Sequence, residues 1–258
     1  MAIAITFTPL PRFTNPAEVT PGFGALKHRQ LVFGMIAIFM YVGGEVSIGS
    51  MLISYLNLPE IGGFSDAEAS IYVSIYWGGQ MIGRFLGAVS LSNSKRWVKL
   101  LVMPSISILA FVILGLTTSF DAALIYLIFL AINLIGFFIG KSLPHRTLYV
   151  FAGINLIFLI IALNSTGSIA LWTIIAIGLF NSIMWSNIFT LAISGLGKYT
   201  SQGSSLLVMM ILGGAILPLM MGAVADSYGV HMSFIIPVFS YLYIAFYGIS
   251  GYKPNKIA

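Results

Sequence analysis

Ionisable and amide side chains are rare inside the long apolar runs of this sequence, and those that occur there are regularly spaced. Glu45 is the only ionisable side chain of residues 31–56. Further along the chain, Tyr76, Gln80 and Arg84 recur at every fourth residue, so a helix places them on one face. An unpaired charge is costly in apolar surroundings. We therefore expect these groups to face one another, another polar helix or a water-filled cavity.

Three states could accommodate the carboxyl group of Glu45. It could be protonated, it could pair with Arg84, or it could face water in a cavity. The first and third states suit a carrier that couples transport to protons, since the carboxyl group would titrate as the cavity changes sides. Pairing with Arg84 is the structural alternative, and the sequence leaves all three open.

A second polar cluster lies in the segment FNSIMWSNIFTLAISG, which contains Asn181, Trp185 and Asn187. Amide groups both donate and accept hydrogen bonds, and the face of an indole ring can stack on the apolar side of a sugar ring. These residues therefore suit a ligand rich in hydroxyl groups. The alternative is that the two asparagines only bond neighbouring helices, at about 1 kcal/mol or less for each contact.

The composition excludes a soluble globular domain. Of the 258 residues, 59% are hydrophobic and 7% are charged, whereas a soluble domain carries about 25% charged residues. The net charge of +5 comes from basic residues whose positions along the chain indicate how a membrane protein is oriented. We therefore expect no nucleic-acid partner. There are no cysteines, no histidine at membrane depth and no paired aspartates, so we expect no cofactor, no metal site and no enzymatic activity.

Hydropathy predicts an all-α polytopic membrane protein, because a helix needs about 20 mostly apolar residues to cross a bilayer. Eight runs meet this condition. They are residues 31–56, 67–91, 98–118, 122–140, 147–163, 169–196, 205–224 and 228–249.

The charged residues support this count of eight. Eleven of the 12 Lys and Arg residues fall on one side if every run crosses, and Arg84 is the exception. The opposite connections hold acidic residues and no basic ones. They contain Glu60, Asp66, Glu68, Asp121 and Asp226. This is the positive-inside pattern, so we expect a multi-pass protein of the bacterial inner membrane with both termini in the cytoplasm.

The chain divides into three parts. Residues 1–28 are expected to be a cytoplasmic segment, since four prolines interrupt it and no signal-peptide pattern is present. Residues 29–252 form the membrane domain, and residues 253–258 form a cytoplasmic tail. Within the membrane domain, the glycine stripe at positions 79, 83 and 87 favours close helix packing. The segment GGAILP, residues 213–218, favours an interrupted helix.

Four segments resemble a known family of transporters. They are YVGGEVSIGS (41–50), YWGGQMIGRFLG (76–87), GLFNSIMWSNIFTLAISGLG (178–197) and GKYTSQGSSLLVMMILGGAILP (197–218). Together they are similar to the C-terminal half of the fucose/glucose/galactose:proton symporters of the major facilitator superfamily. Such carriers have two halves of six helices around a central cavity and work by alternating access.

The resemblance implies that the first and sixth runs line one cavity, so Glu45, Asn181 and Trp185 would share it. We expect the substrate to be a hexose or deoxyhexose such as glucose, galactose or fucose, with a proton as the coupled ion. The candidate substrate-binding residues are Glu45, Tyr76, Gln80, Asn181, Trp185 and Asn187. The candidate residues for proton coupling or an ion pair are Glu45 and Arg84.

Two features depart from the family. Eight runs replace the six of one half, so two of the runs between residues 96 and 163 resemble an added pair. A partner equivalent to the N-terminal half is also missing from this sequence. The alternative function is therefore a truncated or non-transporting membrane partner or sensor derived from such a carrier.

Overall fold

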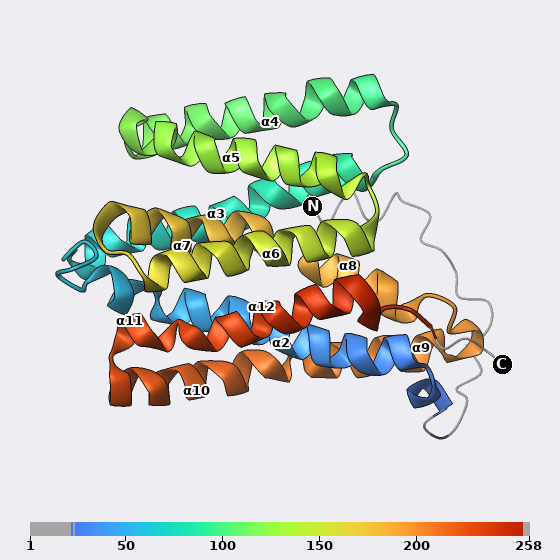
Figure 1. Ribbon diagram of the computed structural model, residues 1–258. Coiled ribbons are helices and arrows are strands. Elements are labelled where there is room, and N and C mark those ends of the chain that lie inside the picture. The colour runs from blue at the N-terminus through green and yellow to red at the C-terminus, as the bar shows by residue number, and fades with distance from the viewer. Residues whose placement is uncertain (1–21, 23, 255–258) are drawn as a thin grey trace, which may run out of the picture.

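The computed structural model describes residue 22 and residues 24–254, and these form a bundle of helices without strands (Figure 1). The predicted all-α polytopic fold is confirmed. The predicted cytoplasmic segment and tail fall largely outside the described residues. The elements are η1 (Gly24–Lys27), α2 (Arg29–Leu56), α3 (Asp66–Leu91), α4 (Arg96–Thr117), α5 (Phe120–Gly140), α6 (Pro144–Leu163), α7 (Gly167–Asn181), α8 (Met184–Ile193), η2 (Gly197–Tyr199), α9 (Thr200–Met209), η3 (Met210–Leu212), α10 (Gly213–Tyr228), α11 (Val230–Ser233), α12 (Ile235–Phe246) and the π-helical η4 (Tyr247–Gly251).

The chain passes along the bundle in alternating directions (Figure 1). In the described part of the chain, seven helical segments are long and apolar enough to cross a membrane, counting α7–α8, η2–α10 and α11–η4 as one segment each. The helix α3 is not among the seven, because its Tyr, Gly, Gln and Arg residues lower its hydropathy. It nevertheless has 26 residues and lies within the same bundle. With α3 the bundle holds eight long helical segments, which matches the number of predicted runs, and the crossing of the membrane by α3 stays a prediction.

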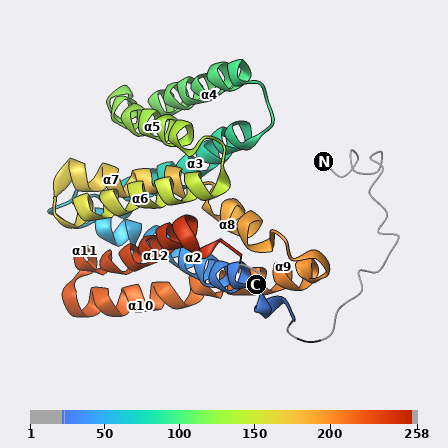
Figure 2. The same cartoon turned by 45° about the vertical axis from the view of Figure 1, so that its right-hand side comes forward.

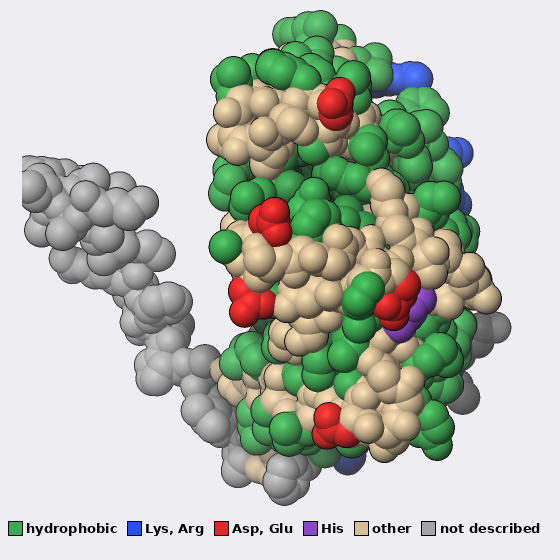
Figure 3. All heavy atoms as spheres, turned by 90° about the vertical axis from the view of Figure 1, so that its left-hand side faces the viewer, with side chains coloured by type: hydrophobic (Ala, Val, Ile, Leu, Met, Phe, Trp, Pro, Cys, Tyr) green, Lys and Arg blue, Asp and Glu red, His purple; other side chains and the backbone are tan. Residues whose placement is uncertain are grey.

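The two ends of the bundle carry opposite charges. Acidic residues lie in or directly beside the connections that follow α2, α4 and α10, and Figure 3 shows Asp and Glu side chains spread over that end. The connections at the other end bear Lys27, Lys95, Lys141, Lys198 and Lys253. The separation of charges along the sequence is thus a separation in space. Which end faces the cytoplasm stays a prediction.

Serine N-caps mark the starts of two helices, α3 and α5, at the acidic end. Ser65 caps α3 in a capping box, in which the Ser65 backbone N–H donates to Glu68 Oε2 at 2.9 Å. Ser119 caps α5 by accepting from the N–H of Ala122 at 3.1 Å. Acidic side chains in the first turn also interact favourably with the helix dipole.

The helix α7 forms the centre of the bundle, because every residue from Ala170 to Asn181 is buried. The glycine stripe of α3 packs against its C-terminal end. A Cβ atom at Gly83 would lie 2.5 Å from the Leu179 carbonyl oxygen, so only glycine permits this approach. The packing role predicted for the stripe is therefore supported.

The helices α2 and α10 approach even more closely. A Cβ atom at Gly213 would overlap the backbone carbonyl of Phe39, and one at Gly43 would lie 2.9 Å from the Gly213 carbonyl oxygen. The predicted interruption occurs at the 3₁₀ turn η3, just before Gly213, whereas α10 continues through Pro218. The backbones of α2 and α10 therefore touch at the residue where α10 begins after the 3₁₀ turn.

The helices α4 and α5 lie at one edge of the bundle (Figures 1 and 2). The helix α4 packs against α3 and α5, whereas α6 packs against α7, α8 and α12 in the interior. The outer hairpin is therefore α4–α5. Its position fits the prediction of an added pair that packs on the outside.

Candidate functional site

The run predicted as one span over residues 169–196 is broken near its middle. The helix α7 ends at Asn181 and α8 begins at Met184, with Ser182 and Ile183 between them. Helix breaks leave backbone carbonyl groups without their usual partner. Here the hydroxyl of Tyr41 lies 3.1 Å from the Asn181 carbonyl oxygen and donates to it. The predicted span is present as one segment with a break near its middle, and a side chain from α2 supports the break.

The carboxyl group of Glu45 lies beside this break. Its Oε1 atom lies 2.7 Å from the Tyr41 hydroxyl oxygen, whose single proton is shared between this atom and the Asn181 carbonyl oxygen. The backbone carbonyl of Glu45 accepts from the Tyr76 hydroxyl at 3.1 Å. The side chain is 9% exposed. The carboxyl group thus has Tyr41 as its hydrogen-bond partner, lies close to Gln80 as well, and keeps a small opening to its surroundings.

Asn181 joins the helices around the break. Its Oδ1 atom accepts from the Tyr241 hydroxyl at 2.8 Å and from Asn155 Nδ2 at 2.9 Å. Its Nδ2 atom donates to the Tyr76 hydroxyl at 3.2 Å. All four side chains are buried. The structure therefore brings together Glu45, Tyr76 and Asn181, three of the predicted site residues, in one network of hydrogen bonds.

Arg84 lies outside this network. In the part of the chain that the structure describes, it forms no ion pair with Glu45, and its Nη2 atom donates to Gln80 Oε1 at 3.1 Å. Gln80 is buried, whereas Arg84 is exposed. Tyr76, Gln80 and Arg84 thus form a polar stripe along α3 that runs from the buried network to the surface.

Arg84 lines an open pocket of about 360 Å³ together with Trp185, Ser182 and Ser186. The ring of Trp185 stacks on Phe189, with centroids 4.9 Å apart and planes 14° from parallel. Gln80 Nε2 and Ser182 Oγ are buried without a hydrogen-bond partner in the described residues. These two groups are closed off in this conformation, so a ligand could bond them only after the neighbouring side chains move.

The remaining predicted residue, Asn187, lies in neither group. It is buried on α8, and its Nδ2 atom has no partner among the described residues. Conversely, the sequence prediction missed Tyr41, Asn155 and Tyr241 of the network. Only Tyr41 carried a signal, since it precedes Glu45 by four residues and so shares its helix face.

Comparisons with known proteins identify relatives of this chain. The chain is 41% identical to a glucose/galactose transporter of Brucella abortus over 229 residues, which cover 89% of this chain and 44% of that protein. It is 31% identical to a putative glucose/galactose transporter of Helicobacter pylori, over 93% of this chain and 48% of the relative. The chain is therefore similar to about half of each of these two transporters.

A solved structure has the same fold as this chain. A crystal structure of the fucose:proton symporter of Escherichia coli superposes with a TM-score of 0.66 at 24% identity, covering 96% of this chain and 50% of the symporter. No protein-family model matches the chain. The chain spans about half the length of the curated relatives it matches. The resemblance to the C-terminal half of the sugar:proton symporter family is confirmed, and the relatives are named as transporters and not as enzymes.

Proposed function

We propose that this chain is the C-terminal half of a carrier that moves a hexose or deoxyhexose across the bacterial inner membrane by alternating access, in symport with protons. The names of the relatives support this proposal, since they comprise glucose/galactose transporters and an L-fucose-proton symporter. In this arrangement the basic end of the bundle faces the cytoplasm, in keeping with the positive-inside rule. Both termini would then be cytoplasmic.

The observation that carries the proposal is the exposed Arg84 beside an open pocket. Arg84 lies seven residues before the end of α3, which corresponds to a depth of about 10 Å along the helix. An arginine that faced lipid at this depth would be costly, so such residues normally face a water-filled cavity or the interior of a bundle. A second half packed against this face would convert the pocket into an enclosed aqueous cavity.

Each part of the site has a role in this proposal. The indole of Trp185 offers a flat face for the apolar side of a sugar ring, and Gln80 and Ser182 would offer unused hydrogen-bonding groups nearby once the neighbouring side chains move. Asn181 and Tyr76 hold the broken helix in place behind the pocket and would contact sugar only after the network rearranges. Glu45 would exchange a proton when a change of conformation opens it to the cavity.

Co-expression tests the proposal. The chain would be produced together with the N-terminal half of the Brucella abortus relative, and uptake of labelled glucose, galactose and fucose into vesicles would be measured. We expect uptake only when both halves are present. Replacing Trp185 with Ala should raise the KM for sugar, whereas the same change at Trp97, which is exposed on peripheral α4, should leave it unchanged.

The role of Glu45 needs a separate measurement. We expect Glu45→Gln to abolish or flatten the dependence of uptake on pH between acidic and neutral conditions. An unchanged pH profile would remove the proton-coupling role and leave the sugar-transport proposal intact. If uptake is absent although both halves assemble, the chain is instead a non-transporting membrane partner or sensor.

A further inference from the structure

A second cavity lies away from the site described above, at the basic end of the bundle between α4 and α5. It measures about 670 Å³ and is lined at one end by polar and basic groups, including Ser90, Arg96, Lys99 and Ser142. Farther along, its lining is apolar and includes Met103, Leu134 and Ile135. The cavity is thus amphipathic along its length, and none of its residues belongs to the network around Glu45.

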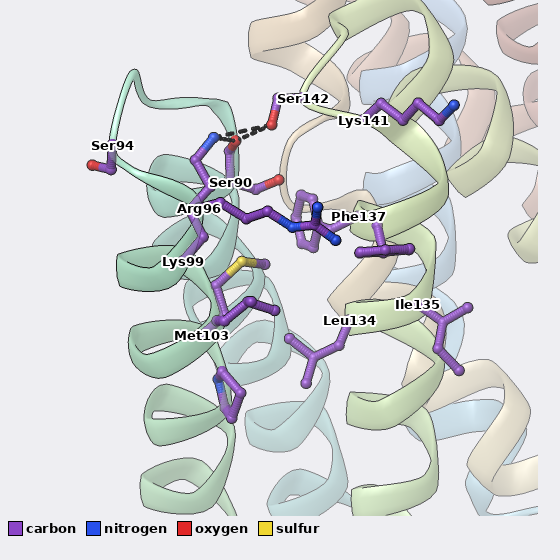
Figure 4. A pocket seen from close by; sticks show the side chains of 13 residues that line it. Ser90, Ser94, Arg96, Lys99, Met103, Leu134, Ile135, Phe137, Lys141 and Ser142 are labelled. Carbon is purple, nitrogen blue, oxygen red and sulfur yellow. Dashed lines mark hydrogen bonds between the residues drawn. The ribbon is translucent and has the colours of Figure 1, made fainter.

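Two basic side chains of α4, Arg96 and Lys99, extend into this cavity toward the C-terminal end of α5 (Figure 4). Lys99 Nζ donates to the Ser90 carbonyl oxygen at 2.6 Å and to Ser142 Oγ at 3.1 Å. Because an ammonium group has three donors, one remains for a ligand. The side chain of Arg96 extends from α4 toward Phe137 of α5, whereas Lys141 points away from both. Arg96 and Lys99 therefore form the polar head of the cavity.

The described residues supply no counter-charge at this place. Apart from Glu45, their acidic side chains lie in turns, or in the first or last turn of a helix, at the opposite end of the bundle. The N-terminus of α4 reinforces the positive potential, since Lys95 provides no side-chain cap and its first turn holds no acidic residue. An anion is therefore the complementary ligand for this end of the cavity.

The apolar end of the cavity decides what kind of anion fits. It lies on helices whose outer faces are strongly exposed, with Ile135 58% and Phe138 66% exposed. In a membrane these faces meet lipid chains, so the cavity opens sideways into the bilayer. A free phosphate ion would occupy only the polar head and leave the apolar part unfilled.

We propose that this cavity, the α4–α5 groove, binds an anionic phospholipid. Its phosphate lies between Arg96 and Lys99, and an acyl chain lies along Met103, Leu134 and Ile135. Basic residues in general mark the cytoplasmic ends of membrane helices. The α4–α5 groove differs because its cations converge on one cavity that continues into an apolar channel. The lipid would thereby bridge the peripheral hairpin to α3, which provides Ser90.

Native mass spectrometry of the delipidated protein tests the proposal. Phosphatidylglycerol, phosphatidylcholine and inorganic phosphate would each be titrated. We expect phosphatidylglycerol to bind more tightly than phosphatidylcholine, and Arg96→Gln to weaken its binding about fivefold, the effect of one cation near a lipid surface. The matched control is Lys198→Gln, which removes one charge at the same end of the bundle but outside the cavity.

A second variant tests the apolar part without changing any charge. Ile135 is exposed, so Ile135→Trp should leave the fold intact while it obstructs the channel. We expect this variant to weaken phosphatidylglycerol binding. Equal binding of the two lipids, equal effects of Arg96→Gln and Lys198→Gln, or binding of inorganic phosphate alone would each overturn the proposal.

Discussion

The hydrogen bonds of Asn181 allow a quantitative test of how the broken helix is held. Replacing Asn181 with Leu keeps a side chain of similar size but removes three hydrogen bonds, to Tyr241, Asn155 and Tyr76. Hydrogen bonds between membrane helices contribute about 0.6 kcal/mol each on average, so we expect a loss of about 2 kcal/mol in the free energy of unfolding. The bond from Tyr41 to the Asn181 backbone remains, so the change isolates the side chain.

The chain offers a matched control for this substitution. Asn187 is also buried, but its Nδ2 atom has no hydrogen-bond partner among the described residues, so Asn187→Leu should leave the free energy of unfolding nearly unchanged. Both variants would be unfolded with sodium dodecyl sulfate in mixed micelles, with tryptophan fluorescence as the signal. If Asn181→Leu shifts the free energy by less than about 0.5 kcal/mol, or no more than the control, the network does not stabilise the break.

Three further predictions concern packing and topology. Gly83→Leu should destabilise the protein by several kcal/mol or prevent folding, because its side chain would overlap α7, whereas Gly78→Ala has open space and should be tolerated in thermal unfolding. Tyr41→Phe should cost about 1 kcal/mol in the free energy of unfolding, since both contacts of its hydroxyl are lost; an unchanged stability would contradict this. Single cysteines replacing Lys95 and Asp226 should react with an impermeant reagent from opposite sides of the membrane, and labelling from the same side would contradict the eight passes.

The general architecture could be predicted because the signals for it are local. A run of apolar residues specifies a membrane helix wherever it occurs, and the side of each charged connection follows from counting the runs. Even α3, which is not among the seven segments apolar enough to cross a membrane, is one of the eight predicted runs, and the alternation of charges supports that count. Its boundaries of Asp66 and Leu91 differ little from the predicted run 67–91.

The break after Asn181 could not be predicted from local sequence. Neither proline nor glycine lies between α7 and α8, and these residues are the usual signals for a broken helix. The break depends instead on Tyr41, which is 140 residues away in the chain. A contact at such a distance leaves no periodic pattern that a single sequence could reveal.

The candidate site shows the same division between local and distant information. The four-residue spacing placed Tyr76, Gln80 and Arg84 correctly on one face of α3. It could not show that Tyr76 points into a closed network while Arg84 reaches an open pocket. That difference arises because α7 and α8 cover only part of the stripe.

The contact between Gly213 and Phe39 constrains how the molecule can move. Two backbones that touch directly leave no layer of side chains to rearrange between them, so sliding one helix past the other would cause immediate steric overlap. The helices α2 and α10 must therefore travel as one rigid body. Any rocking motion that exposes Glu45 to one side of the membrane would carry both of them together.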